Sequence, residues 1–362
     1  MSAAESRVER AVAVHDETAV DRYVLRNTNG MELACLSFGG IFERLLVPNA
    51  QGELADVVLG FDRVEDYLTD RCYFGALIGR FANRIDHARF VLDGSMYLLE
   101  PNEGAHHLHG GVMGFHAHHW TCAMAETSEG QAVVLRLVSP HGDAGYPGTV
   151  QVQVTYTLTN DNALIVDYHA DTDKATPFSM TQHAYFNLSG GACDILGHEL
   201  TLAASSFLPV NTDLIPTGEV RRVSGTPFDF RTPQVIGSRI DTADEQLAHG
   251  DGYDHNFVLD RLPGTPASLV ATLVDQYNGR QLDVLTTAPG LQLCTGNNLH
   301  RGVRGKGGKE YTRCRGVALE TQHFPNSPNR PDFPSSILRP GEPLHSRTMF
   351  QFTALRTPSQ RP

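Results

Sequence analysis

The chain has 362 residues, of which 41% are hydrophobic and 19% are charged, an ordinary balance for a globular protein. Its 41 acidic and 29 basic residues give a formal net charge of −12, and an acidic chain without a clustered basic face is a poor candidate for binding nucleic acid or anionic membranes. No run approaches the roughly 20 apolar residues of a membrane helix, and the charged N-terminus lacks the apolar core of a signal peptide.

Short runs of alternating apolar residues, punctuated by 34 Gly and 20 Pro, predict β-strands along the chain. FDRVEDYL (61–68) predicts two helical turns, and little else has a period of 3.6 residues. The clearest strand-like runs, in chain order, are AVVLRLV (132–138), GTVQVQVTYTLTNDNALIVDYHA (148–170), ASLVATLVDQ (267–276) and RTMFQFTAL (347–355). Many short antiparallel strands with little helix predict an all-β fold, a large antiparallel β-sandwich.

The run at 148–170 predicts a β-hairpin with its turn at Asn160–Asn162. Two sets of alternating side chains share strand faces: Val150, Val152, Val154, Tyr156 and Leu158 in the first strand, and Leu164, Val166 and Tyr168 in the second. No repeat or low-complexity linker divides the chain. We therefore expect one domain over residues 21–356, with flexible ends at 1–20 and 357–362.

Six cysteines are spread over the chain without a C-x-x-C pair: Cys35, Cys72, Cys122, Cys193, Cys294 and Cys314. This spacing indicates reduced thiols in a cytoplasmic protein. The basic segment RGVRGKGGKE (301–310) lacks the G-x-x-x-x-G-K-[ST] pattern of a phosphate-binding loop. We expect it to be a mobile, solvated loop.

Polar side chains interrupt several strand-like apolar runs, where burial is costly unless they are paired or used. They are Arg80, Asn83 and Arg84 in GRFANRID, His183 in TQHAYF, Asp254 in GYDHNF, Gln292 in LQLC and Glu320 in ALETQ. Each taken alone is more simply a satisfied structural group or an outward-facing strand residue. Taken together, the Glu and the His form an acid–base pair, and the other side chains suit the hydroxyl groups of a neutral polyol.

Six histidines crowd NEGAHHLHGGVMGFHAHHW, between His106 and His119. A metal site is one interpretation, but the segment lacks H-E-x-x-H, and neighbouring strand residues such as His106 and His107 point to opposite sides. We expect His109, beside two glycines that let backbone approach a ligand closely, to be the functional histidine. If the segment is extended, His107 lines the same cleft, and the remaining histidines are packing or surface residues.

At these residues the chain strongly resembles the aldose 1-epimerase family, the galactose mutarotases, over about residues 25–355. The blocks that carry the resemblance are GRFANRI, LHGG, GYPG, TQHAYFNLSG, LPVNTDLIPTGE, TPFDFR, GYDHNF, TGN and LETQHFPNSPNRPDFP with the RPGE that follows. Their order and spacing are highly specific. The resemblance implies a single antiparallel sandwich with an open sugar cleft and no cofactor or metal.

The resemblance also implies a role for each matching residue. Glu320 would be the catalytic base and His183 the general acid that together open and close the sugar ring. The substrate-binding residues would be Asn83, Arg84, His109, Asp254 and Gln292. The implied partner is a small sugar rather than a nucleic acid or a membrane, and the protein would be a monomer or homodimer.

Four positions depart from the usual family pattern: Gln182 replaces Asn, Asn211 replaces Asp, Ala288 replaces Gln and His116 replaces Asp. None removes the proposed acid, base or principal ligands, so the sugar preference is the more open question. Two alternatives to an epimerase acting on galactose or glucose follow. The same chemistry could act on a disaccharide or a specialised hemiacetal, or the sandwich could bind sugar without catalysis.

Overall fold

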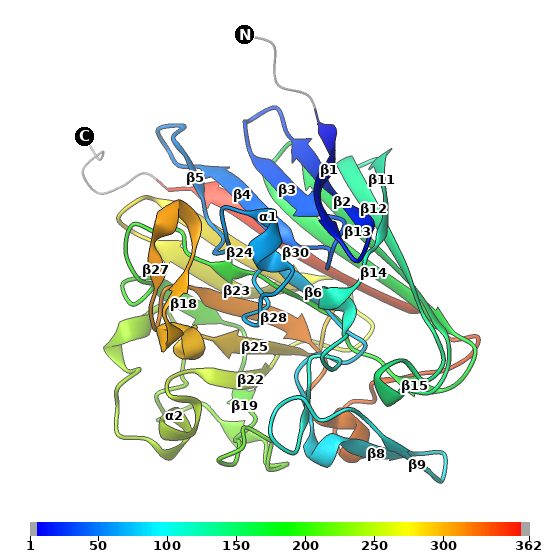
Figure 1. Cartoon of the computed structure of the whole chain (residues 1–362). Coiled ribbons are helices and arrows are strands. Elements are labelled where there is room, and N and C mark those ends of the chain that lie inside the picture. The colour runs from blue at the N-terminus through cyan, green and yellow to red at the C-terminus, as the bar shows by residue number, and fades with distance from the viewer. Residues whose placement is uncertain (1–5, 356–362) are drawn as a thin grey trace.

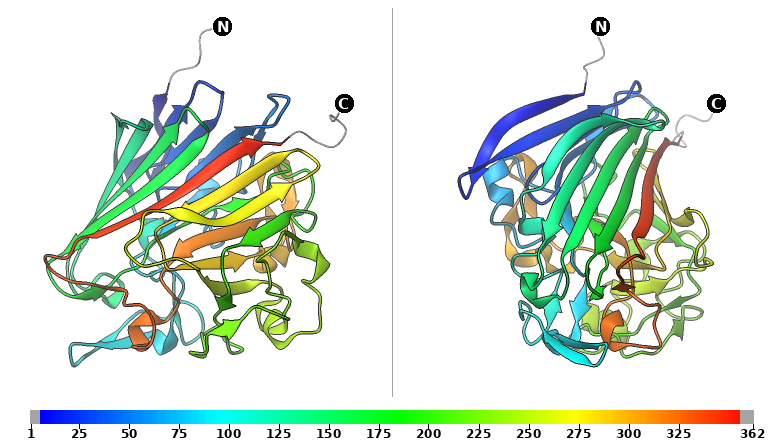
Figure 2. Two further views of the ribbon diagram at one scale, coloured as in Figure 1. Left: turned by 180° about the vertical axis from the view of Figure 1, so that it is seen from behind. Right: turned by 90° about the vertical axis from the view of Figure 1, so that its right-hand side faces the viewer.

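The computed structural model describes residues 6–355, and its largest element is a nine-stranded antiparallel sheet (Figures 1 and 2). In spatial order its strands are β11 (Thr121–Glu126), β12 (Gly130–Ser139), β13 (Val150–Thr159), β14 (Ala163–Thr172), β30 (Leu344–Ala354), β24 (Arg280–Thr286), β23 (Ser268–Asp275), β18 (Glu199–Leu202) and β21 (Gln234–Val235).

A six-stranded antiparallel sheet lies against it (Figure 1). In spatial order its strands are β17 (Tyr185–Phe186), β28 (Val317–Gln322), β25 (Gly290–Cys294), β22 (Asp254–Val258), β19 (Ser206–Phe207) and β20 (Arg221–Arg222). Leu33, Val154 and Leu319, from three different sheets, belong to one buried hydrophobic cluster. The prediction of an all-β antiparallel sandwich is confirmed.

A five-stranded sheet near the N-terminus completes the core. Its strands are β1 (Arg7–His15), β2 (Thr18–Arg26), β3 (Glu32–Leu36), β4 (Phe42–Pro48) and β5 (Leu54–Asp56). The prediction of a flexible end over residues 1–20 is wrong for β1, which pairs with β2. A register shift between Glu9 and Ala13 breaks the period-two pattern of β1. The strand therefore cannot be recognised in the sequence by regular alternation. Residues 357–362 lie outside the described part of the chain.

The remaining strands form two-stranded pairs: β6 (Ala76–Ile78) with β16 (Thr181–His183), β7 (Arg84–Ile85) with β10 (His107–Leu108), β8 (Arg89–Leu92) with β9 (Ser95–Leu98), β15 (Thr176–Pro177) with β29 (Ile337–Leu338), and β26 (Val303–Arg304) with β27 (Glu310–Tyr311). Among described residues, the α-helices are α1 (Val64–Tyr67) and α2 (Glu245–Gly250). Helix α1 confirms a helix within 61–68, although its four residues form one turn rather than the two predicted. Helix α2 was not predicted, because six residues are too few to show a period.

The predicted hairpin at 148–170 is confirmed as β13 and β14, paired from Val150↔Thr172 to Leu158↔Leu164. All eight of the side chains predicted to share these strand faces are buried. Each buried Val or Leu contributes roughly 1.5–3 kcal/mol relative to an exposed position. Alternation of apolar side chains therefore fixes both the register of this hairpin and the sheet face that meets the core.

The segment 301–310 includes β26 and the first residue of β27, which pair with each other, rather than the mobile loop expected from its composition. Between these strands, Lys306 Nζ donates to Asp56 Oδ2 at 2.6 Å and to the carbonyl of Val58 at 2.9 Å. The basic segment is thus tied to the five-stranded sheet. Among the helices of the described chain, none has the length and apolar character required to cross a membrane.

Candidate active site

Glu320 and His183 face each other between two neighbouring strands. Glu320 lies in β28, and His183 is the last residue of β16. His183 Nε2 is 3.7 Å from Glu320 Oε1, and both side chains are almost fully buried. This separation is longer than a hydrogen bond, so the two atoms are within reach of a common third group without being bonded to each other.

Burial shifts the pKa values of this pair in opposite directions. Loss of solvent, reinforced by the charge of Asp254 and opposed by that of Arg84, raises the pKa of Glu320 to about 8. Loss of solvent also lowers the pKa of His183 to about 4, because burial disfavours the charged form of either group. Near neutral pH the pair therefore holds one proton, which resides on Glu320 in the unliganded protein.

His109 stands beside this pair in a left-handed backbone conformation, with φ of 53°. Its Nδ1 accepts a hydrogen bond from the backbone N–H of Asn83 at 3.2 Å. Burial, with the positive charge that His183 and Arg84 can carry, lowers the pKa of His109 well below its ordinary value. A neutral His109 therefore carries its proton on Nε2 and is a hydrogen-bond donor.

The glycine beside His109 has a different role from the one expected. Gly110 has φ of +87°, and a Cβ atom there would lie only 1.9 Å from the carbonyl oxygen of Gly79. The close approach that the structure shows at Gly110 is therefore to another part of the chain. Glycine is required here because the 110 segment packs directly on the Gly79 backbone.

Arg84 and Asn83 follow each other at the start of β7. Arg84 is buried and makes a bidentate ion pair with Glu103, with Nε–Oε2 at 2.6 Å and Nη2–Oε1 at 2.8 Å. Such a pair fixes the plane of the guanidinium. Asn83 has φ of 67°, and its Oδ1 accepts from the backbone N–H of Arg84 at 2.8 Å. Among the residues that the structure describes, the side-chain N–H groups of Asn83 have no acceptor, so they can donate to a ligand.

Asp254 and Gln292 project from β22 and β25. Gln292 Nε2 donates to Asp254 Oδ1 at 2.7 Å. Gln292 also lies directly opposite Glu320 in the β25–β28 register, so the two side chains share one face of the sheet. Gln292 Oε1 and Glu320 Oε2 are buried without a hydrogen-bond partner among the described residues. Buried acceptors left in this state are costly and are available to a polar ligand.

All seven predicted site residues thus come together from separate elements. The charges of Arg84, Asp254 and Glu320 act on one another, and the His109 and His183 rings are 5.1 Å apart. The set offers two carboxyl groups, two imidazoles and several further hydrogen-bond donors and acceptors. This chemistry suits proton transfer on a neutral, hydroxyl-rich molecule.

Two residues of this region were missed in the sequence. Glu103 orients Arg84, and Tyr73 packs against His109 and His183, with ring centroids 4.8 and 5.8 Å apart. Neither has a distinctive sequence signal, because one glutamate in a loop and one tyrosine in RCYFGAL look like surface or core residues. Only the folded chain brings them to the site.

The four departures from the family pattern have different positions. Gln182 Nε2 donates to the carbonyl of Gly75, and the His116 ring lies 4.8 Å from the Tyr73 ring. Asn211 Oδ1 accepts from two backbone N–H groups of its own turn. Ala288 is buried, with its backbone N–H bonded to Thr286 Oγ1. Gln182 and His116 therefore contact the loop that also carries Tyr73.

His107 does not line the site with His109, because the left-handed conformation of His109 turns the chain. The His107 side chain is fully buried, with Nδ1 2.6 Å from the carbonyl of Glu100 and its ring 5.3 Å from that of Tyr146. His107 is therefore a packing residue. Trp120 and Phe115, in the same segment, also form an edge-on pair in the core.

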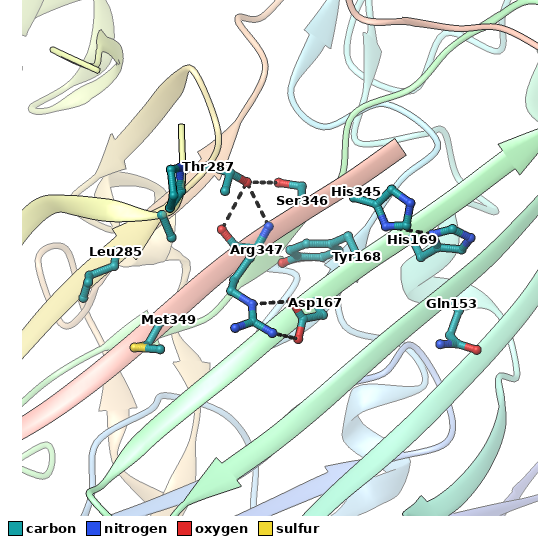
Figure 3. A pocket seen from close by; sticks show the side chains of 12 residues that line it. Gln153, Asp167, Tyr168, His169, Leu285, Thr287, His345, Ser346, Arg347 and Met349 are labelled. Carbon is teal, nitrogen blue, oxygen red and sulfur yellow. Dashed lines mark hydrogen bonds and ion pairs between the residues drawn. The ribbon is translucent and has the colours of Figure 1, made fainter. Parts of the chain in front are cut away.

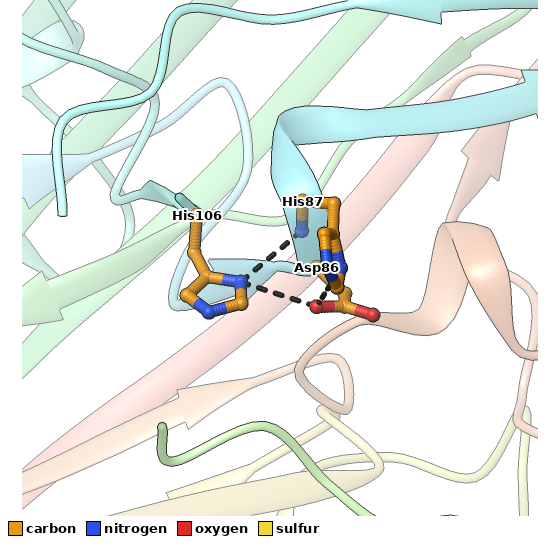
Figure 4. A group of neighbouring side chains, drawn as sticks. All are labelled: Asp86, His87 and His106. Carbon is orange, nitrogen blue, oxygen red and sulfur yellow. Dashed lines mark hydrogen bonds and ion pairs between the residues drawn. The ribbon is translucent and has the colours of Figure 1, made fainter. Parts of the chain in front are cut away.

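His106 belongs to a separate cluster with Asp86 and His87 (Figure 4). His106 Nδ1 lies 3.1 Å from Asp86 Oδ1 and also accepts from the backbone N–H of His87. The single lone pair of that nitrogen is thus already engaged by the protein. The cluster has the composition of a metal site, but hydrogen bonds within the protein already engage His106 Nδ1, His87 Nδ1 and Asp86 Oδ1.

His109, His183 and Glu320 form a second group with metal-ligand chemistry. One ligand atom of each lies within 4.8 Å of the others, and all three side chains are buried. Two imidazoles and a carboxylate can hold a zinc or iron ion. The same three side chains are needed for proton transfer and for sugar binding. A chelation experiment therefore distinguishes a metal site from a metal-free acid–base site.

A groove of about 870 Å³ lies elsewhere, on the nine-stranded sheet (Figure 3). Its wall includes the paired histidines His169 and His345, whose Nδ1 atoms are 3.1 Å apart, and Arg347, which is bonded to Asp167. None of the seven predicted site residues lines it. The groove is therefore distinct from the Glu320–His183 pair.

Residues 21–351 match the family described as aldose 1-epimerase. The chain belongs to the aldose 1-epimerase family. Galactose mutarotase of Rattus norvegicus is 42% identical over 336 residues, which cover 92% of this chain and 94% of that protein. Aldose 1-epimerase of Escherichia coli (strain K12) is 37% identical over 332 residues, with 91% and 94% covered.

Solved structures agree with this membership. The crystal structure of galactose 1-epimerase from Lactobacillus acidophilus NCFM superposes with a TM-score of 0.85 at 28% identity, covering 97% of this chain and 99% of that one. The predictions of an aldose 1-epimerase, of its sandwich fold and of an isomerase are therefore confirmed. The comparisons name the activity of relatives, whereas the roles of individual residues remain predictions.

Proposed function

We propose that this member of the aldose 1-epimerase family interconverts the α and β anomers of a free aldohexose, with D-galactose or D-glucose as substrate. The observation that carries this proposal is the buried Glu320–His183 pair, whose Oε1 and Nε2 atoms are 3.7 Å apart. Burial raises the pKa of the carboxyl group and lowers the pKa of the imidazole. Relatives named galactose mutarotase support galactose as one substrate.

Ring opening needs a base at the anomeric hydroxyl, O1, and an acid at the ring oxygen, O5. The Glu320 carboxylate takes the proton from the anomeric hydroxyl, and the C1–O1 bond becomes a carbonyl. The C1–O5 bond breaks, and O5 takes its proton from the His183 imidazolium. Each positioned proton transfer contributes typically about 10²–10⁴-fold to the rate.

Anomer exchange follows from a rotation in the open-chain sugar. The aldehyde turns about the C1–C2 bond and presents its other face to O5. His183 then removes the proton from O5, and Glu320 returns a proton to O1 as the ring closes. Both residues end in their starting states, so the cycle consumes no cofactor and produces no net proton.

The proton distribution of the unliganded site matches the open-chain stage of this cycle. In that stage Glu320 is protonated and His183 is neutral, which is the arrangement that burial favours. The ring-opening step needs the opposite arrangement. Hydrogen bonds from sugar hydroxyls and the charge of Arg84 favour the Glu320 carboxylate, so a bound sugar draws the proton across to His183.

The remaining residues would hold the sugar hydroxyls. His109 donates from Nε2 near the ring oxygen, while Asn83 and Arg84 donate to sugar oxygens. Asp254 accepts from ring hydroxyls, and Gln292 supplies a free Oε1 beside it. Each side chain of this set is either uncharged or already bonded to another protein side chain, as Arg84 is to Glu103 and Asp254 is to Gln292. The set therefore suits a neutral ligand.

A substrate panel tests the sugar assignment. We expect catalysed mutarotation of fresh α-D-galactose and α-D-glucose, followed by polarimetry, with a disaccharide such as lactose turned over more slowly. A disaccharide preferred over both hexoses would favour the alternative substrate class. Binding of galactose without any acceleration of its mutarotation would instead favour a non-catalytic sugar-binding sandwich.

We also propose that the enzyme works in the cytoplasm as a monomer or homodimer. The six cysteines are widely spaced along the chain without a C-x-x-C pair, which supports a reducing compartment. Light scattering on the purified chain measures its mass and decides between the two assembly states. Extraction of the native protein with a membrane fraction or a larger mass would contradict this part of the proposal.

A further inference from the structure

No other described residue forms a hydrogen bond that holds the ring of His183. Its Nδ1 is buried without a partner in the described chain, and its Nε2 lies 3.7 Å from Glu320, beyond hydrogen-bond range. A catalytic imidazole usually has one nitrogen fixed by a carboxylate or a carbonyl. The orientation of His183 must therefore come from the side chains packed around it.

Three aromatic rings surround His183. Tyr185 lies 5.1 Å away, His109 lies 5.1 Å away at an interplanar angle of 83°, and Tyr73 lies 5.8 Å away at 41°. Tyr73 also contacts His109 directly, at 4.8 Å and 61°. Tyr73 is therefore the side chain that touches both the proposed acid and the neighbouring sugar-binding histidine.

The backbone around Tyr73 is held in place from both sides. Asp70 accepts hydrogen bonds from the N–H groups of Cys72 and Phe74, each at 2.8 Å. Tyr73 itself has φ of 58°, a left-handed conformation that is unusual for a bulky residue and persists only where the surroundings enforce it. The loop thus presents the Tyr73 ring in one fixed direction.

The same loop is tied to the strand that carries His183. Gly75 donates its N–H to the carbonyl of His183 at 3.0 Å, and Gln182 Nε2 donates to the carbonyl of Gly75. On the far side of the Tyr73 ring, the half-buried His116 ring packs edge-on at 4.8 Å and 80°. Tyr73 is thereby clamped between His116 and the two site histidines.

We propose that Tyr73 is a positioning residue, whose aromatic ring fixes the His183 imidazole in the direction of Glu320. This inference rests on the proposed function, because it concerns the geometry of its acid. The aromatic ring, rather than the phenol hydroxyl, performs this role. The hydroxyl forms no hydrogen bond with any residue in the described part of the chain, whereas the ring makes three contacts.

A pair of substitutions separates ring from hydroxyl. We expect Tyr73→Phe to keep kcat and KM within about twofold of wild type, since the ring contacts remain. We expect Tyr73→Leu to lower kcat by about 10²-fold, because a displacement of about 1 Å has that effect on a positioned group. KM should change by less than about threefold, because the sugar-binding residues are retained.

Two further readouts exclude a merely structural effect. Loss of the ring admits water to His183, so the acid limb of the Tyr73→Leu rate profile should move toward higher pH. Imidazole-nitrogen NMR of His183 should shift in Tyr73→Leu and not in Tyr73→Phe. Tyr277→Leu, at a tyrosine that is 90% exposed, is the matched control and should behave as wild type in every assay.

Each remaining outcome overturns the inference. Equal losses in Tyr73→Phe and Tyr73→Leu would assign the role to the hydroxyl. A raised KM with unchanged kcat would make Tyr73 a sugar ligand, and wild-type kinetics in Tyr73→Leu would remove any role. An inactive wild-type enzyme would refute the proposed function instead, which keeps the two failures distinguishable.

Discussion

At the scale of single residues, the reaction depends on Glu320 and His183. Glu320→Gln and His183→Asn keep similar volumes but remove the proton acceptor and donor, so each should lower kcat by about 10²–10⁴-fold. Circular dichroism should show native spectra for both variants. Full activity in Glu320→Gln would contradict the assignment of the base.

The pH dependence of activity follows from the single proton shared by these two residues. Below about pH 4 His183 gains a proton while Glu320 keeps its own, so no base remains. Above about pH 8 Glu320 loses its proton and His183 is neutral, so no acid remains. We therefore expect a bell-shaped profile of kcat/KM between these limits. A profile that stays flat through pH 8 would contradict this assignment.

The free energy of unfolding should depend on pH through the protonation of the same carboxyl group. The raised pKa of Glu320 means that the folded protein binds a proton that the unfolded chain releases, from the ordinary pKa of 4.5 up to about 8. This contribution to stability is therefore lost as pH rises. Urea unfolding should show Glu320→Gln gaining stability relative to wild type from about pH 5 to about pH 8. A constant difference would refute the shift.

At the scale of elements, the block GRFANRI contains two arginines with unrelated roles. Arg84 faces the site, whereas the buried Arg80 guanidinium donates to the carbonyls of Ser139, Pro140, Pro147 and Gly148. Sequence alone marks both as polar residues in an apolar run. Only the direction of each side chain separates the structural arginine from the proposed sugar ligand.

Loss of Arg80 should therefore affect stability before it affects chemistry. Each buried acceptor left without a donor costs about 1–3 kcal/mol, so Arg80→Met should lower the free energy of unfolding by at least about 3 kcal/mol. Arg231→Met, at a surface ion pair with Asp229, is the matched control and should change it by less than about 1 kcal/mol. Similar losses in both variants would contradict the role of Arg80.

The sequence predicts elements best where alternation is regular. The β13–β14 hairpin was predicted with its faces because its apolar residues keep strict period two. Strand β1 was missed because a register shift interrupts that period. The site residues were found through the family motifs, but their convergence depends on pairings between distant strands. Tyr73 and the true role of Gly110 depend on contacts that no local pattern encodes.

At the scale of the whole molecule, the net charge of −12 should have little influence on a neutral sugar. We expect kcat/KM to vary by less than about twofold between low and high salt, because electrostatic steering acts on charged ligands. Stopped-flow polarimetry over a salt series measures this directly. A steep fall with salt would point to a charged substrate.

The His109, His183 and Glu320 group makes metal dependence a necessary test. Proton transfer by side chains predicts that activity survives exhaustive chelation followed by dialysis. A metal-dependent reaction would instead be lost on chelation and restored by added zinc. Activity that requires the added metal would contradict the proposed mechanism.

The central claim is that the chain catalyses anomer exchange through Glu320 and His183. The most direct measurement follows the optical rotation of freshly dissolved α-D-galactose with wild type, Glu320→Gln and His183→Asn side by side. The account predicts that wild type reaches the equilibrium rotation far sooner than sugar alone, whereas both variants approach the spontaneous rate. A wild-type trace indistinguishable from spontaneous mutarotation, for galactose and glucose alike, would contradict it.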